Sequence, residues 1–381
     1  MQPDATVFSG ARVVDAAGIR DDGWVEVRGE RITAVGSGPA PTDGAHVVDT
    51  GGAWLTPGFI DLHGHGGGGH AFDAEADDIR AALGTHRRHG TTRSIISLVS
   101  APTVDLERRL STVAGIAESD PLVLGSHLEG PFLAPARKGA HRESDLIAPT
   151  ADLLERLLDA SAGTVRQLTL APELPGGLDA IEFLRTRGVV TAVGHTDADH
   201  ALTREAFARG ARLLTHAFNA MPGIGHRAPG PVIAAIEDPR VVLELVLDTH
   251  HVHPSVAALL FAAAPGRVAL VTDAMAAAGV GDGAYRLGTL DVDVRDGVAR
   301  LRGDGTLAGS TLTQDVALRL AVDVAGIDLP TAVAALTAIP AEVLGRSDEL
   351  GLIAPGYLAD LVVLEPDFSV RQVWAAGSRL A

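Results

Sequence analysis

The sequence contains no cysteine and only one lysine, Lys138, among its 31 basic residues. Without cysteine there are no disulfides and no thiolate metal sites, so any metal must be held by His, Asp or Glu. No apolar run approaches the ~18 residues of a membrane span, and no basic-then-apolar leader is present. We therefore expect neither a membrane span nor a secretory signal, and a cytoplasmic location.

Acidic residues outnumber basic ones by 48 to 31, which gives a formal net charge of −17 at pH 7. Such a balance argues against nucleic acid or an anionic membrane as a partner. It leaves open an anionic small substrate, provided that a local cationic pocket exists. The 381 residues, 46% of them hydrophobic, exceed the ~250 that one (β/α)8 barrel needs.

The two ends of the chain share one pattern of short alternating runs without helical periodicity. Residues 1–55 predict a small antiparallel β unit, with a hairpin turn at residues 28–30. Residues 360–365 and 370–376 have the same character. We predict a small β-sandwich from residues 1–55 and 349–381, and a barrel from residues 56–348.

Between these ends, apolar strands alternate with amphipathic helices. The predicted strands are Phe59–Leu62, Thr92–Val99, Leu122–Leu128, Val165–Leu170, Val189–Val193, Arg212–Thr215, Val241–Leu247 and Val268–Thr272. The predicted helices are Ala76–His89, Thr103–Glu118, Ala151–Ala160, Asp179–Arg187, Asp199–Arg209, Thr313–Val324 and Pro330–Leu344. An inserted hairpin is expected at residues 290–294 and 297–301. Eight such strands predict an α/β fold, a (β/α)8 TIM barrel with the terminal β-sandwich beside it.

The first barrel strand ends in two histidines, His63 and His65, followed by a run of glycines. Residues i and i+2 of a strand point to the same side, so both imidazoles can reach one point in space. A single histidine is more often a satisfied core or surface residue. The pair at a strand end favours a metal site.

Polar residues also stand at the ends of four further predicted strands. Glu129 follows the third strand, His195 the fifth, His216 the sixth and Asp273 the eighth. Active sites of such barrels form at the carboxyl ends of the strands, from several strands at once. Packing does not explain this set, because buried unpaired polar groups are costly.

These ligand types suit Zn²⁺, and also Fe²⁺, Mn²⁺ or Co²⁺. Glu129, His195 and His216 offer three ligands and leave a position open for water, while His63 and His65 can complete a second site. The single lysine lies in a loop well past the third strand, so the bridge between two ions should be Glu129. Asp273 then fits as the general base that takes a proton from a metal-activated water.

The sequence resembles the amidohydrolase superfamily, and within it the N-acetylglucosamine-6-phosphate deacetylases. The matching stretches are PGFIDLHGHG (57–66), HLEGPF (127–132), KGAH (138–141), GHTDA (194–198), THAFNAM (215–221), DTHHV (248–252), VTDAM (271–275) and TLAGS (306–310). LEGPF, THAFNAM and the VTDA ending are together specific to this group. The histidine pair is shared by many amidohydrolases.

The resemblance implies hydrolysis of the acetamide of an N-acetylglucosamine 6-phosphate to glucosamine 6-phosphate and acetate. It implies a metal on Glu129, His195 and His216, with Asp273 as acid and base. The substrate contacts that it implies are Ala140, His141, Asn219, Ala220, Arg227, Asp248, His251, Leu307, Ala308 and Gly309. It also implies a homodimer in which Arg227 reaches the phosphate in the neighbouring subunit. Some members lack the strand-1 histidine pair and use one metal, so one or two ions remain open here.

The same residues leave other functions open. A deacetylase of N-acetylgalactosamine 6-phosphate, or a cyclic-amide hydrolase, would use the same metal centre. A non-enzymatic scaffold leaves the ligand set without a purpose. Gly64–Gly69 formally matches a dinucleotide-binding pattern, but no acidic residue follows about 20 residues later. His86 and His89 are expected to face solvent, and His251 rather than His250 is expected to face the site.

Overall fold

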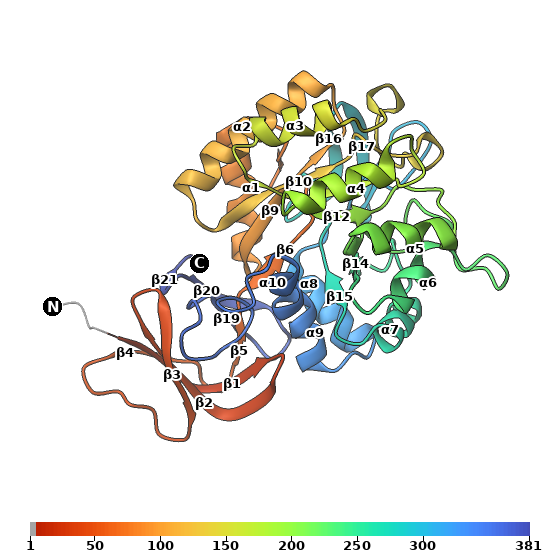
Figure 1. Cartoon of the computed structure of the whole chain (residues 1–381). Helices are drawn as coiled ribbons and strands as arrows, with labels where there is room; N and C mark the ends of the chain where they lie inside the picture. Colours follow the sequence, from red (N-terminus) through yellow and green to blue (C-terminus); the bar gives the residue numbers. More distant parts are fainter. Residues whose placement is uncertain (1–4) are drawn as a thin grey trace. The chain divides into compact units, whose positions relative to one another are not determined.

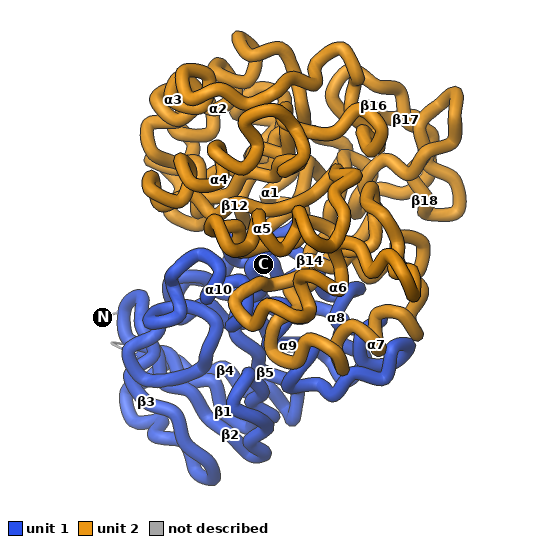
Figure 2. The backbone as a smooth tube through the Cα atoms, turned by 45° about the vertical axis from the view of Figure 1, so that its right-hand side comes forward, with its two compact units in different colours: residues 1–61, 86–93, 314–381 blue, residues 62–85, 94–313 orange. Residues whose placement is uncertain are grey.

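The computed structural model describes residues 5–381, and the chain divides into two compact units (Figure 2). Unit 1 contains the described residues up to 61, together with residues 86–93 and 314–381. Unit 2 contains residues 62–85 and 94–313. Every residue of the predicted metal and substrate sites lies in unit 2, so the site can be described within one compact unit.

The terminal segments of unit 1 form one sheet, with the strand order β21-β20-β19-β5-β1-β2-β3 and β4 pairing with β1. Its strands are β1 (Thr6–Asp15), β2 (Gly18–Arg28), β3 (Arg31–Ser37), β4 (His46–Asp49), β5 (Trp54–Pro57), β19 (Leu361–Leu364), β20 (Val370–Ala375) and β21 (Ser378–Arg379). Antiparallel pairing of β5 with β19 places Leu55 opposite Val363 and joins the two ends of the chain. The Phe8 ring packs edge-on against Trp374 with centroids 5.2 Å apart. The predicted pairing of the two termini is confirmed, but the N-terminal strands are not all antiparallel, because β1 runs parallel to β4 and β5.

A second sheet carries its strands in sequence order, β6-β9-β10-β11-β12-β13-β14-β15 (Figure 1). Its strands are β6 (Phe59–Asp61), β9 (Thr91–Val99), β10 (Val123–Glu129), β11 (Val165–Leu170), β12 (Val190–Val193), β13 (Leu213–Leu214), β14 (Val242–Leu245) and β15 (Val268–Leu270). Every residue of β9 and of β10 is buried, as strands covered on both faces require. A parallel bridge between Gly64 and Ala274 closes the ring at the carboxyl ends. The eight predicted strands and the (β/α)8 barrel are confirmed.

Helices alternate with these strands, and in Figure 1 α2 to α5 lie outside β9 to β12. The helices are α1 (Ala76–Arg88), α2 (Thr103–Ser119), α3 (Ala151–Ala160), α4 (Gly177–Thr186), α5 (His200–Arg209), α6 (Gly230–Glu237), α7 (Pro254–Ala263), α8 (Gln314–Arg319), α9 (Leu329–Leu336) and α10 (Ala338–Val343). Short 3-10 turns cover Pro135–Arg137 and Glu143–Asp145, and a π-helical turn covers Leu320–Val324. In α2, Leu106, Leu110 and Val113 bury the face that its periodicity predicts. Among residues 5–381, no helix combines the length and apolarity needed to cross a membrane.

Two local predictions were wrong, and a third was incomplete. The helix expected over residues 330–344 is broken at Thr337 into α9 and α10, because the ring of Pro340 would clash with the carbonyl of Leu336 in a continuous helix. The expected hairpin is confirmed as β17 (Leu290–Arg295) and β18 (Val298–Leu301), and β16 (Gly283–Leu287) adds a third strand to it. His86 is buried at 3% exposure, since its spacing places it on the α1 face that buries Ile79.

Candidate active site

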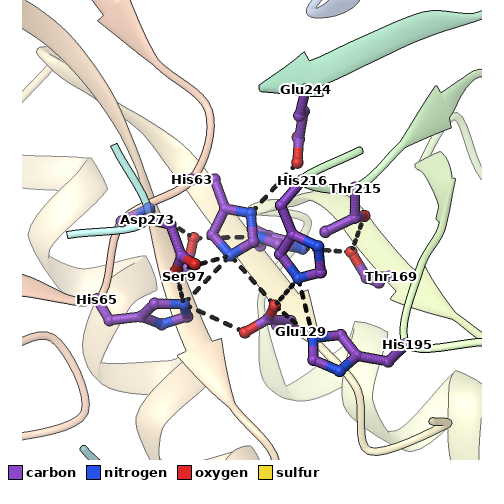
Figure 3. Close-up of polar contacts among 12 residues, drawn as sticks. His63, His65, Ser97, Glu129, Thr169, His195, Thr215, His216, Glu244 and Asp273 are labelled. Carbon is purple, nitrogen blue, oxygen red and sulfur yellow. Dashed lines mark hydrogen bonds and ion pairs between the residues drawn. The ribbon is translucent and has the colours of Figure 1, made fainter. Parts of the chain in front are cut away.

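The predicted ligand residues meet at the carboxyl ends of the barrel strands. His63 and His65 follow β6, Glu129 is the last residue of β10, and Asp273 lies three residues past β15. His195 and His216 each stand two residues past their strands, β12 and β13. All six side chains point into one cluster (Figure 3), and each is at most 8% exposed. The cluster is therefore a buried group of imidazoles and carboxylates.

Glu129, His195 and His216 form the first of two groups around one carboxylate. The Oε1 atom of Glu129 lies 3.1 Å from His195 Nε2 and 3.2 Å from His216 Nε2, and the two Nε2 atoms lie 3.0 Å apart. Tetrahedral ligands at bond lengths of about 2.0–2.1 Å stand about 3.3 Å from one another. The spacing and chemistry of these three donors fit a Zn²⁺-type ion.

His63, His65 and Asp273 form the second group, beside the first. The Nε2 atoms of His63 and His65 lie 3.2 Å apart, and His65 Nε2 lies 3.2 Å from Asp273 Oδ1. Glu129 faces this group as well, with Oε2 3.2 Å from His65 Nε2 and Oε1 3.4 Å from His63 Nε2. One carboxylate therefore stands between both groups, the arrangement expected of a bridging ligand.

Burial and opposite charges together set the protonation of this cluster. Burial alone would lower the pKa of His65, but hydrogen bonds to Asp273 and Glu129 raise it to about 9. Burial also opposes the charge of Asp273, yet the His63 and His65 imidazoles hold its pKa below the ordinary value. Burial opposes the charge of Glu129 as well, and the nearby imidazoles of His63 and His141 lower its pKa. The carboxylates are therefore ionised at neutral pH, and a bound cation competes with protons on the imidazoles.

Three of these residues adopt left-handed backbone conformations. The φ angles are 45° at His195, 27° at His216 and 47° at Asp273, in a region that costs non-glycine residues of order 1–3 kcal/mol. Backbone hydrogen bonds hold them there, including Ala134 N to His195 O at 2.9 Å and Asp273 N to His63 O at 2.8 Å. The barrel thus keeps each strand turning sharply where its side chain enters the cluster.

A pocket of about 280 Å³ opens onto the cluster. Its lining includes the predicted substrate contacts Ala140, His141, Asn219, Ala220, His251, Leu307 and Gly309, together with His65, Glu129, His195, His216 and Asp273. Asp248 stands behind the lining and accepts a hydrogen bond from His251 Nδ1 at 2.7 Å. Burial alone would lower the pKa of His251, but this contact raises it, which favours an imidazolium at the pocket. Ala308 is buried beside the lining, and Arg227 is exposed on the loop before α6 without lining the pocket.

Two residues around the site, Arg137 and His127, were not predicted from the sequence, and His141 has a contact beyond its predicted role. Arg137 lines the pocket, and its guanidinium pairs with Asp197 at 2.8 Å. His127 is buried below the cluster and bonds Ser97 Oγ at 3.0 Å. It lies two residues before Glu129 on β10, and residues i and i+2 of a strand point to the same face, so this spacing could have placed His127 on the side of Glu129. His141 Nε2 lies 3.3 Å from Glu129 Oε2, nearer the cluster than a substrate contact alone requires.

Comparisons with known proteins agree with this geometry. The Amidohydrolase family model matches residues 54–380. The chain is 36% identical to an N-acetylgalactosamine-6-phosphate deacetylase of Escherichia coli O157:H7, over 97% of this chain and 98% of that protein. It is 34% identical to an N-acetylglucosamine-6-phosphate deacetylase of Vibrio furnissii, over 87% of this chain and 84% of that protein.

Solved structures show the same relationship. The structure of an N-acetyl-D-glucosamine-6-phosphate deacetylase mutant from Mycobacterium smegmatis, in complex with N-acetyl-D-glucosamine-6-phosphate, superposes with a TM-score of 0.94 at 42% identity, over 99% of this chain and 100% of that chain. The deacetylase of Pasteurella multocida reaches the same TM-score at 28% identity, over 98% of this chain and 99% of that one. With a family model that spans most of the sequence and a barrel that carries its ligand set, the chain belongs to the amidohydrolase family.

Proposed function

We propose that the chain hydrolyses the acetamide of N-acetyl-D-glucosamine 6-phosphate to D-glucosamine 6-phosphate and acetate, a step of amino-sugar catabolism. The observation that carries the proposal is the convergence of Glu129, His195 and His216 beside Asp273 in an open pocket. Deacetylases of phosphorylated N-acetyl sugars, at 34–42% identity over most of the chain, support the substrate class. A phosphorylated sugar does not cross a bilayer unaided, so the enzyme must share the compartment where the sugar phosphate is formed, for which we propose the cytoplasm.

The metal centre follows from the two groups of donors. Glu129, His195 and His216 would hold the primary ion, for which we propose Zn²⁺, with Fe²⁺, Mn²⁺ or Co²⁺ as chemically suitable alternatives. His63 and His65, with Glu129 between the groups, would hold a second ion. Such an ion, when bound, lowers the pKa of water toward about 7 and polarises a carbonyl oxygen.

Asp273 would move the proton of the reaction. Its carboxylate is ionised at neutral pH, because the positive charge beside it, whether on the imidazoles or on a bound cation, lowers its pKa, so it can accept a proton from water. The water oxygen bonds to the acetyl carbon, the C–N bond breaks, and the proton passes from Asp273 to the departing amine. The products are acetate and the free amino sugar.

The pocket lining would bind the sugar and its phosphate. We assign the sugar to Asn219, Ala220 and the segment 307–309, with Ala140 and His141 on the opposite side. The His251 imidazolium, held by Asp248, would add positive charge. Arg227 is exposed and has no hydrogen bond or ion pair within residues 5–381, so its guanidinium is available for the role that we propose in a homodimer, at the phosphate of the neighbouring subunit.

Purified, metal-loaded protein is expected to release acetate from N-acetylglucosamine 6-phosphate, and a chelator is expected to abolish that release. Coupled acetate detection measures the rate before chelation, after it, and after adding Zn²⁺ back. Activity that survives complete metal removal would contradict the proposed chemistry. Absence of acetate release with metal bound would contradict the substrate assignment.

The same assay separates the second candidate function, deacetylation of N-acetylgalactosamine 6-phosphate. This candidate is favoured by the E. coli relative, because the similarity to it extends over nearly the whole of both chains. Comparing kcat/KM for the two epimers, each with and without phosphate, decides between them. A higher value for the galacto epimer would replace the proposed substrate, and a chain that binds no metal and cleaves none of the four would favour the scaffold hypothesis.

Arg227→Ala is expected to raise KM for the phosphorylated sugar by about 10- to 100-fold and to leave kcat nearly unchanged. A hydrogen bond to a charged group contributes about 1.5–3 kcal/mol, at about 1.4 kcal/mol per factor of ten. Steady-state kinetics on the phosphorylated and unphosphorylated sugars measure the effect. Arg204→Ala, which removes an exposed arginine of α5, is the matched control.

Mixed dimers test whether Arg227 acts across subunits. Combining Arg227→Ala with Asp273→Asn subunits creates one site that has an intact Asp273 and receives Arg227 from its neighbour. That site is expected to recover the wild-type KM. An unchanged KM in Arg227→Ala alone would contradict the phosphate role.

A further inference from the structure

Glu244 is a buried carboxyl group that neither the sequence motifs nor the proposed reaction uses. It lies on β14, and its side chain has no exposed surface. Burying a carboxyl group is costly unless both of its oxygens have partners. Glu244 Oε2 lies 3.2 Å from His63 Nδ1, and Oε1 accepts a hydrogen bond from Gln167 Nε2 at 2.7 Å. Both oxygens are therefore engaged, one of them on a candidate metal ligand.

The contact fixes which nitrogen of His63 faces the cluster. Figure 3 shows the His63 ring between Glu244 on one side and His65 with Glu129 on the other. When Nδ1 donates its proton to Glu244, Nε2 is the unprotonated nitrogen of the neutral ring. That nitrogen lies 3.2 Å from His65 Nε2 and 3.4 Å from Glu129 Oε1. Glu244 thus holds His63 in the tautomer and orientation that a metal ligand needs.

The other imidazoles of the cluster are held differently. His195 Nδ1 contacts the backbone carbonyl of Arg137 at 2.9 Å. Within residues 5–381, Nδ1 of His65 and Nδ1 of His216 have no hydrogen-bond partner. A carboxylate behind a histidine ligand raises its basicity and fixes its orientation. This support falls on the second group of donors and not on Glu129, His195 and His216.

We propose that Glu244 is a positioning residue for His63 and that it determines whether the chain retains a second divalent ion. The inference rests on the proposed metal centre and not on which acetamide is cleaved. Glu244 also accepts the backbone N–H of Ala217 at 2.8 Å through its main-chain carbonyl, a contact that no side-chain substitution removes. The side chain can therefore be changed while this support of the loop after His216 is kept.

Glu244→Gln is expected to lower the affinity for the second ion by about 10- to 100-fold and to leave the affinity for the first unchanged. Metal-free protein is titrated with Co²⁺ and Zn²⁺ against a chromophoric chelator, and bound ions per chain are counted by elemental analysis after gel filtration. Wild type is expected to bind two ions, and Glu244→Gln one at the concentrations that saturate wild type. Gln167→Met, which removes only the donor to Oε1, is expected to shift the second affinity in the same direction by less.

Thr191→Val is the matched control, because Thr191 is a buried polar residue of β12 whose hydroxyl has no hydrogen-bond partner within the described chain. It is expected to bind both ions as wild type does. Wild type that binds a single ion would overturn the proposal, as would equal affinities in wild type and Glu244→Gln. Equal weakening of both ions would also overturn it. Should Glu244→Gln fail to fold, an unchanged second affinity in Gln167→Met decides against it. None of these measurements of bound ions depends on acetate release, so a failure of this proposal can be told apart from a failure of the deacetylase assignment.

Discussion

Asp273→Asn is expected to lower kcat by about 100- to 10,000-fold, the range that one general acid–base group contributes. Asparagine keeps the size of the side chain and can still bond His65, but it cannot accept and return a proton. KM should change little, because the proposed sugar contacts come from other residues of the pocket. Steady-state acetate release measures the loss, and elemental analysis shows whether the primary ion on Glu129, His195 and His216 is still bound.

The pH dependence of the wild type provides a second test of Asp273. Its pKa is lowered in the folded chain, so the carboxylate is already ionised well below neutral pH, and acid inactivation from this group should begin only below its ordinary pKa of 3.8. Asp179→Asn, an exposed substitution on α4, is the control and should retain full activity. Activity of Asp273→Asn within tenfold of wild type, with metal bound, would show that another group moves the proton.

Most of the barrel and much of the candidate site could be predicted because both depend on local patterns. Apolar strands alternated with amphipathic helices eight times, and a closed barrel brings the carboxyl ends of all its strands to one face. His63, Glu129, His195, His216 and Asp273 could therefore be placed together although up to 210 residues separate them in the chain. Their assigned reaction roles remain predictions.

What could not be predicted depends on pairs that only the closed barrel creates. Glu244 interrupts an apolar strand, and nothing local indicates that its partner is His63, 181 positions earlier. The pairing of Leu55 with Val363 likewise depends on the register between β5 and β19, which come from opposite ends of the chain. The burial of His86 is different, because its spacing from Ile79 already placed it on the apolar face of α1.

Glu129 is the one carboxylate of the described chain that contacts both groups of candidate ligands. Its Oε1 atom faces His195 and His216 and also lies 3.4 Å from His63 Nε2, while Oε2 faces His65. No single imidazole has this position, so the carboxylate is the member whose loss should affect every ion at once. Its substitution should therefore have the largest effect on metal content.

Glu129→Gln is expected to release the bound metal and to lower kcat/KM at least about 1,000-fold, because an ion supplies several kcal/mol of transition-state stabilisation at about 1.4 kcal/mol per factor of ten. The neutral amide removes a charge from the site and also the carboxylate that raises the pKa of His63. Ions per chain after dialysis against a weak chelator, and acetate release, are the two measurements. Glu205→Gln on the surface of α5 is the control. A folded Glu129→Gln protein that keeps its metal and its activity would remove Glu129 from the metal centre and with it the bridge between the two groups.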